Sequence, residues 1–244
     1  MQDGLNGLIV PHAPLLLPEV LESSREGAAA RVRKGCAAAA RVFDGPRALV
    51  ASPHAMHTGV YVAPYGDLAE LGPRAPAVLC PLDLDASREI AGRWGKPEID
   101  EPLDHGIVVG LLLAPPPVPV VAVGFAQDVD AREDAAALAE VLEEMAFAGT
   151  VVASANLSAG LTDGAPLTRL PGAEELERET IDRLRLDAGS LLETAPRLTA
   201  AAGSCGLGPL SLLGHLFEGR PAEVLAHEWP FGVGYLVATI AASG

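Results

Sequence analysis

The sequence predicts a three-layer α/β/α fold with a mostly parallel or mixed central sheet. Short apolar runs alternate with longer helical stretches along the whole chain, which is the pattern of α/β proteins. No linker rich in Ser, Gly or charged residues interrupts this alternation, so residues 1–244 are expected to form a single domain. Hydrophobic residues make up 49% of the chain, which is enough to fill a sizeable core.

The first two predicted strands each end at a proline that is followed by a histidine. Residues 8–10 (LIV) end a buried strand before Pro11, and residues 19–43 then form a long alanine-rich helix. Residues 47–52 (RALVAS) form a second strand that ends before Pro53. Ligands of open α/β sheets bind beyond the carboxyl ends of the strands. His12 and His54 are therefore expected at a binding site.

The rest of the chain continues the alternation. Further strands are expected over residues 77–80, 118–124, 150–155 and 232–240, and further helices over residues 87–94, 130–147, 173–186 and 209–217. The helix over 130–147 is amphipathic, with Asp and Glu on one face, so it should cover the sheet from one side.

Composition excludes several classes of function. A net charge of -15 argues against binding to nucleic acid, which requires clustered Lys and Arg. Three cysteines are too few for a disulfide framework, and no segment has the ~18 consecutive apolar residues of a membrane span. No signal peptide, phosphate-binding glycine loop, CxxC pair, HExxH or GxSxG motif is present. A soluble, cytoplasmic protein that binds a small molecule is expected.

Three histidines near the N-terminus are candidates for a metal site. His12 (VPHAP) and His54 (SPHAMH) each lie in a stiff, proline-flanked turn, where an imidazole can point outward. Taken singly, each is more often an ordinary turn histidine that bonds to backbone carbonyls; the pairing of the two makes a functional site an equal alternative. His57 follows His54 by three residues and is a candidate for a group beside the metal or the substrate.

Three other short motifs carry polar groups. In LDHG, Asp104 could orient the imidazole of His105, although the two residues could equally be an exposed pair in a loop. In GSCGLG, Cys205 could bind iron, zinc or copper as a thiolate, or be an inert small residue in a tight loop. His227 and Glu228 could be ligands, but a solvated turn is the commoner case.

Six segments spread over nearly the whole chain resemble the class III extradiol dioxygenase family, the LigB-type proteins, and their relatives the Memo proteins: VPHAPLLLPEV, ASPHAMHTGVY, LDHGIVVGLLL, ASANLSAGL, SCGLGPLSLLGHLF and EWPFGVGYLVA. The resemblance implies a non-haem Fe(II) site at which O₂ opens catechol-like rings. His12 and His54 match the two histidine ligands. Cys205 takes the position of the third ligand, which is glutamate in ring-cleaving members and cysteine in the Memo branch. His105 matches a histidine of the substrate pocket, and a homo-oligomer is also implied.

The fourth of these segments departs from the dioxygenase pattern. Where ring-cleaving members read SGDLSH, this chain reads SANLSA, so Asn156 replaces an aspartate and Ala159 replaces the acid/base histidine. Such a group contributes ~10²–10⁴-fold in rate. Two functions stay open: an iron-dependent oxygenase in which His57 or His105 is the catalytic acid/base, and a Memo-like protein that binds iron, copper or zinc without turnover.

Overall fold

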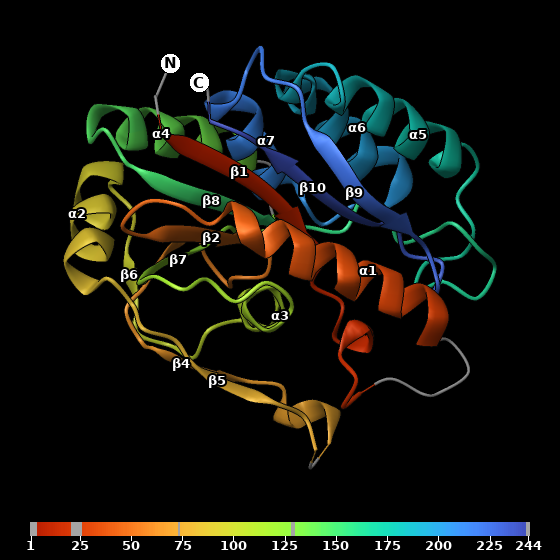
Figure 1. Cartoon of the computed structure of the whole chain (residues 1–244), viewed down its shortest axis with the longest axis horizontal. Coiled ribbons are helices and arrows are strands. Elements are labelled where there is room, and N and C mark those ends of the chain that lie inside the picture. Colours follow the sequence, from red (N-terminus) through yellow and green to blue (C-terminus); the bar gives the residue numbers. More distant parts are fainter. Residues whose placement is uncertain (1–3, 21–25, 73, 128–129, 243–244) are drawn as a thin grey trace.

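The computed structural model describes residues 4–20, 26–72, 74–127 and 130–242. Its main feature is an eight-stranded sheet with the strand order β6-β3-β7-β2-β8-β1-β10-β9 (Figure 1). The strands are β1 (Leu5–Val10), β2 (Ala48–Ser52), β3 (Gly59–Tyr61), β6 (Glu98–Ile99), β7 (Val120–Gly124), β8 (Gly149–Ser154), β9 (Glu223–Glu228) and β10 (Tyr235–Ile240). A separate hairpin pairs β4 (Tyr65–Asp67) with β5 (Ala77–Leu79).

The centre of the sheet is parallel and is joined to both flanks by antiparallel pairs, while β6 at one edge pairs in parallel with β3. Strands β1, β8, β2 and β7 pair in parallel, whereas β10 runs antiparallel to both β1 and β9, and β3 runs antiparallel to β7. The sheet is therefore mixed, and the predicted α/β class is confirmed. Val10 lies opposite Ser154, and Ser52 lies opposite Gly124. The four parallel strands consequently end at one level.

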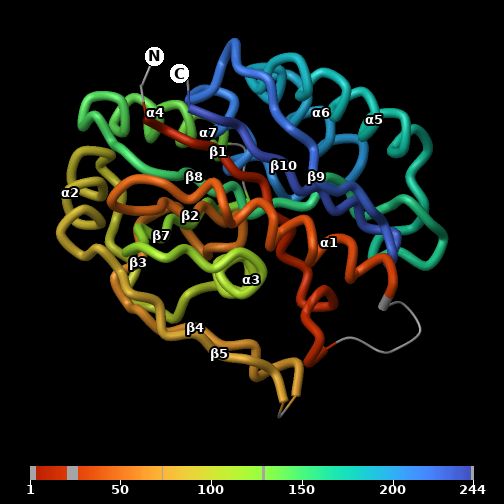
Figure 2. Tube along the Cα trace, viewed as in Figure 1, coloured from red at the N-terminus to blue at the C-terminus, as the bar shows by residue number. Residues whose placement is uncertain are grey.

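Helices cover both faces of the sheet (Figures 1 and 2). Successive strand residues alternate between two apolar layers, so that in β1 Ile9 packs into one layer and Leu8 and Val10 into the other. Residues of α1 (Glu26–Ala39) and α3 (His105–Leu113) form one layer; those of α2 (Leu84–Trp94), α4 (Ala131–Glu144), α5 (Ala173–Leu184), α6 (Leu191–Ala202) and α7 (Leu207–Leu216) form the other. Short 3-10 helices span Pro14–Leu16, Ala40–Val42, Ala69–Leu71 and Ala188–Ser190.

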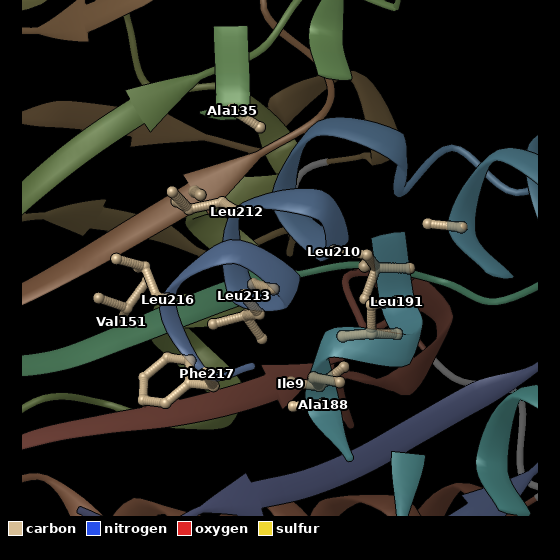
Figure 3. Close-up of a cluster of buried hydrophobic side chains, with 14 of the residues drawn as sticks. Ile9, Ala135, Val151, Ala188, Leu191, Leu210, Leu212, Leu213, Leu216 and Phe217 are labelled. Atoms are coloured by element: carbon tan, nitrogen blue, oxygen red, sulfur yellow. The ribbon is translucent and has the colours of Figure 1, made fainter. Parts of the chain in front are cut away.

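Helix α7 is packed deeply against the sheet. Figure 3 shows its leucines and Phe217 beside Ile9 of β1 and Val151 of β8. Leu210, Leu213 and Phe217 are all fully buried, and truncating such a leucine to alanine typically costs about 2–5 kcal/mol. Because α7 begins two residues after Cys205, this packing anchors the loop that carries the cysteine.

Helix α3 is apolar on all sides and is enclosed. Seven of its nine residues are buried, since the helix lies between the sheet and the β4–β5 hairpin. Its first residue is His105, and Asp104 caps its N-terminus. Asp104 and His105 thus belong to a partly buried helix start, and the exposed-loop reading of this pair is wrong.

Several predicted boundaries shift. The helix expected over residues 19–43 is described only from Glu26, and residues 21–25 lie outside the described part of the chain. The strand predicted at 77–80 exists as β5, but it belongs to the small hairpin rather than to the main sheet. Residues 223–228 form the edge strand β9, so the reading of His227 and Glu228 as a solvated turn is wrong. Among the helices of the described residues, none is long and apolar enough to cross a membrane.

Candidate metal centre

The level ends of the parallel strands bring polar side chains to one edge of the sheet. His12 lies two residues beyond β1, His54 two beyond β2, and Asn156 two beyond β8. The side-chain oxygen of Asn156 lies 3.4 Å from the backbone nitrogen of His12, which donates to it. Strand order and register therefore assemble this edge from segments that are far apart in the sequence.

Three imidazoles converge there. The Nε2 atoms of His12 and His54 lie 3.0 Å apart. The ring of His105 lies 4.0 Å from the ring of His54 and 5.8 Å from that of His12, measured between centroids. One nitrogen from each histidine can be chosen so that all three lie within 4.8 Å of one another. This cluster could hold a metal ion.

The hydrogen bonds of Ser154 determine which nitrogen of His12 faces the cluster. The Ser154 hydroxyl donates to the carbonyl oxygen of Gly106 at 2.7 Å, and its oxygen lies 3.2 Å from Nδ1 of His12. A hydroxyl has one proton, so the oxygen accepts from Nδ1–H. The lone pair of neutral His12 is then on Nε2, the atom that faces His54, and this is the tautomer that a metal ligand needs.

Gln127 also contacts the site, and it belongs to none of the motifs that predicted a functional residue. Its side-chain amide lies 3.0 Å from Nδ1 of His54. If the amide nitrogen donates there, the proton of neutral His54 is on Nε2; if the amide is turned to present its oxygen, Nδ1–H donates and Nε2 is free to bind a metal. Gln127 is the third residue after β7, the fourth of the parallel strands. This position beyond a strand end is the sequence feature from which it could have been predicted as a site residue.

Cys205 lies beside His12, in the loop between α6 and α7. Its sulfur is 3.3 Å from Nε2 of His12. Gly203, with φ 68°, ends α6 in a left-handed conformation and turns the chain into this loop. Burial raises the pKa of the Cys205 thiol, so binding a metal through sulfur would release a proton from it.

The two central histidines are held neutral. Burial, with the neighbouring imidazoles, lowers the pKa of His12 well below its usual value. Burial and then His105 lower the pKa of His54 to about 4, although Asp104 opposes the shift. Neutral imidazole is the form that binds metal, so neither ring has to lose a proton near pH 7.

Asp104 ties the first turn of α3 to the sheet. Its carboxylate accepts from the hydroxyls of Ser52 (2.6 Å) and Tyr61 (2.8 Å) and from the backbone N–H of Gly106 (2.8 Å). A Cβ on Gly106 would overlap the Ser52 hydroxyl, so glycine is what allows α3 to approach β2. The position of His105 beside His54 follows from this close approach.

The cluster forms part of the wall of a cavity of about 410 Å³. Its polar groups come mainly from the three histidines, Asn156 and Cys205, and the rest of the lining is largely apolar. His57 is exposed and is not one of the described residues that line it. Ala159 is part of the lining, so the cavity carries a methyl group where the dioxygenase pattern has an acid/base histidine. The lining residues are His12, Ala13, Pro14, Leu15, His54, His105, Asn156, Ala159, Pro166, Gly203, Cys205, Phe231, Val233 and Tyr235.

The donor set fits a transition metal. Two nitrogens that each bind one ion at about 2.1 Å are about 3.4 Å apart in tetrahedral geometry and about 3.0 Å apart at an angle near 90°. The two Nε2 atoms, which lie at a hydrogen-bond distance of 3.0 Å, are close to these separations. His12 and His54 would supply two ligands. His105 can place a nitrogen within 4.8 Å of both, whereas the sulfur of Cys205 is seen beside His12 alone and is not part of that cluster of described residues. Imidazole and thiolate suit iron, zinc and copper rather than magnesium or calcium.

Comparisons with known proteins bear on the fold. No family model and no curated protein matches the chain. Among solved structures, the crystal structure of the uncharacterized protein JW3007 from Escherichia coli K12 is similar, with a TM-score of 0.62 and 17% sequence identity over 97% of this chain and 99% of that one. At this identity the likeness establishes a shared fold over almost the full length of both chains.

Proposed function

We propose that this protein is a non-haem iron-dependent oxidoreductase of the class III extradiol type, which acts on an aromatic or other small molecule with O₂. The observation that carries the proposal is the convergence of His12, His54 and His105 in the wall of a largely apolar cavity. Such a cavity suits an aromatic ring, and an oxygenase needs its metal to be reachable from the substrate pocket.

Cys205 is proposed as the third ligand beside His12 and His54. Its sulfur lies close to Nε2 of His12, and this choice leaves His105 free to contact the substrate. Bound Fe(II) would supply open coordination positions for O₂ and for a substrate oxygen.

The protein's own residues would then orient the substrate and move its protons. Phe231 and Val233 line the apolar part of the cavity and exclude water from the ring. His105 is the candidate for proton transfer, because Ala159 has no group that titrates. His57 is a weaker candidate, since its side chain is exposed and outside the cavity lining of the described chain.

A Memo-like protein that binds iron or copper without ring cleavage is the second candidate. It is favoured by Ala159 and Asn156, which both line the cavity in place of the acid/base histidine and the aspartate. A thiolate ligand also shifts the preference of the site toward Cu(I) or zinc.

Metal analysis tests the site itself. Protein purified without added metal should contain close to one equivalent of metal, and His12→Ala and Cys205→Ser should each lose most of it. His57→Ala is the matched control, because it removes an exposed imidazole from the same loop as His54 and should keep the metal. His105→Ala separates the two candidates for the third ligand: if His105→Ala loses the metal and Cys205→Ser keeps it, the assignment of Cys205 is wrong.

Oxygen uptake tests the chemistry. Iron-loaded protein should consume O₂ with at least one member of a panel of catechols, and His105→Ala should reduce that rate without changing the metal content. No uptake by the wild type, together with uptake by Ala159→His, would support the metal-binding alternative and would show what the chain lacks.

A further inference from the structure

A second cavity, separate from the metal centre, lies between α5 and β9. Its volume is about 260 Å³, and none of the described residues that line it also lines the metal cavity. The lining residues are Leu161, Glu174, Glu177, Arg178, Ile181, Asp182, Arg185, His227 and Trp229.

A buried carboxylate–imidazole pair forms part of this cavity. Glu177 of α5 is 1% exposed, and one of its oxygens lies 2.8 Å from Nε2 of His227 on β9. Gly234 packs directly on the same carboxylate, where a Cβ would overlap the other oxygen, Oε1. Residues from α5, β9 and the turn before β10 thus enclose the pair.

The pair can present acceptors to the cavity. A carboxylate can only accept, so when His227 is neutral its ring proton lies on Nε2, and Nδ1 keeps a lone pair. Oε1 of Glu177 is buried and has no hydrogen-bond partner among the described residues. The other oxygen, Oε2, bonds to His227, so one oxygen of a buried carboxylate is left to be satisfied.

Trp229 adds an aromatic surface that favours a cation. Its side chain is 47% exposed, and its ring lies 5.2 Å from the ring of His227, measured between centroids. The face of an indole attracts cations through its quadrupole.

The outer residues of the cavity carry both signs of charge. Arg185 bonds to Asp182 at 3.0 Å, so these two charges offset each other. The lining then retains Glu174 and Glu177 against Arg178. Among the lining residues, carboxylates therefore outnumber guanidinium groups. The outer part of the cavity, like the inner part, favours a cation.

We infer that this cavity is a second ligand site, which binds a small organic ammonium ion through His227 and the face of Trp229, with Glu177 supplying the negative charge. A primary ammonium group supplies the donors that the inner groups lack, and an attached ring or chain would contact Leu161 and Ile181. The site does not depend on the proposed metal chemistry.

Tryptophan fluorescence gives a direct test, because the chain has two tryptophans and Trp94 is buried away from solvent. In Trp94→Phe, emission reports on Trp229 alone. Benzylammonium should change this emission with a saturable curve, whereas benzyl alcohol and benzoate at equal concentration should bind at least about tenfold more weakly. Equal binding of all three probes would overturn the inference.

Variants test the residues. Glu177→Gln should raise the dissociation constant of benzylammonium about tenfold. Glu175→Gln is the matched control, because it removes the same charge from the same helix at an exposed position outside the lining of this cavity. Unchanged binding by Glu177→Gln, or equal loss in both variants, contradicts the site.

Two further measurements test the inference even if Glu177→Gln does not fold. If that variant does not fold, as judged by circular dichroism, Trp229→Leu replaces an exposed side chain, and calorimetry should show several-fold weaker binding of benzylammonium. His12→Ala should bind benzylammonium as the wild type does. Loss of binding in His12→Ala would place the probe in the metal cavity and refute the second site, while leaving the metal proposal intact.

Discussion

The hydroxyl of Ser154 connects His12 to the start of α3, accepting from Nδ1 of the imidazole over 3.2 Å and donating to the carbonyl of Gly106. One side chain therefore sets the tautomer of a candidate ligand and joins strand β8 to the helix that carries His105. Ser154→Ala should lower metal affinity about 10–100-fold.

Competition with a chelator measures this loss. Ser87→Ala is the control, because Ser87 is also fully buried and its hydroxyl has no partner within the described chain. Equal affinities in the two variants would mean that the tautomer of His12 does not depend on Ser154.

Gln127 should control the tautomer of His54 in the same way. Gln127→Glu offers only acceptors, so Nδ1–H donates to it and Nε2 is free; metal affinity should stay the same or rise. Gln127→Leu removes the contact and should lower the affinity about tenfold. Isothermal titration with the metal distinguishes the two, and a Glu variant that binds more weakly than the Leu variant would contradict this role.

Gly106→Ala should destabilise the protein by about 1–3 kcal/mol, because the added methyl group meets the Ser52 hydroxyl. It should also weaken metal binding, since α3 must move away from the sheet. Gly92→Ala is a matched control in α2, where a Cβ meets nothing within 4 Å; it should be neutral or stabilising. Urea unfolding gives both values, and equal stabilities would show that α3 tolerates the displacement.

The metal-free protein should lose stability as the pH falls from about 6.5 to 5. Burial lowers the pKa of His54 to about 4, whereas an unfolded histidine titrates near 6.5. In this window the unfolded chain takes up a proton at His54 that the folded chain does not, so this residue alone lowers the free energy of unfolding by about 1–2 kcal/mol. His12, whose pKa is also lowered well below its usual value, adds to the fall. Urea unfolding in the presence of a chelator measures the fall, which should be smaller in His54→Gln; identical slopes would contradict the shift.

Local signals were sufficient to predict His12, His54 and the strands that precede them. A short run of apolar residues marks a strand from a few positions alone, and β1, β2, β7 and β8 were all found this way; for β1 and β2 a following proline also marked the end. Helix α3 was missed because it is apolar on every side, so no 3.6-residue periodicity separates a buried face from an exposed one.

The supporting contacts of the site could not be predicted in the same way. Ser154 meets His12 only because β8 pairs with β1, and Ser52 meets Asp104 only because α3 packs over β2. Neither pairing can be seen within a short segment. Strand β9 was missed because its polar side chains suggested a turn; in the structure Glu228 pairs with Arg31 of α1 and His227 with Glu177 of α5.

Because the four central strands end at one level, the positions at which this chain can accept an inserted residue are restricted. A residue inserted within β8 would reverse the facing of every later side chain in that strand, turning Ser154 toward the α7 layer and away from His12. The same insertion in the loop after Ser154 leaves the facing of the strand side chains unchanged and alters only the conformation of the loop. Mutational scanning should therefore find that the loops after these four strands tolerate insertions, whereas the strands themselves do not.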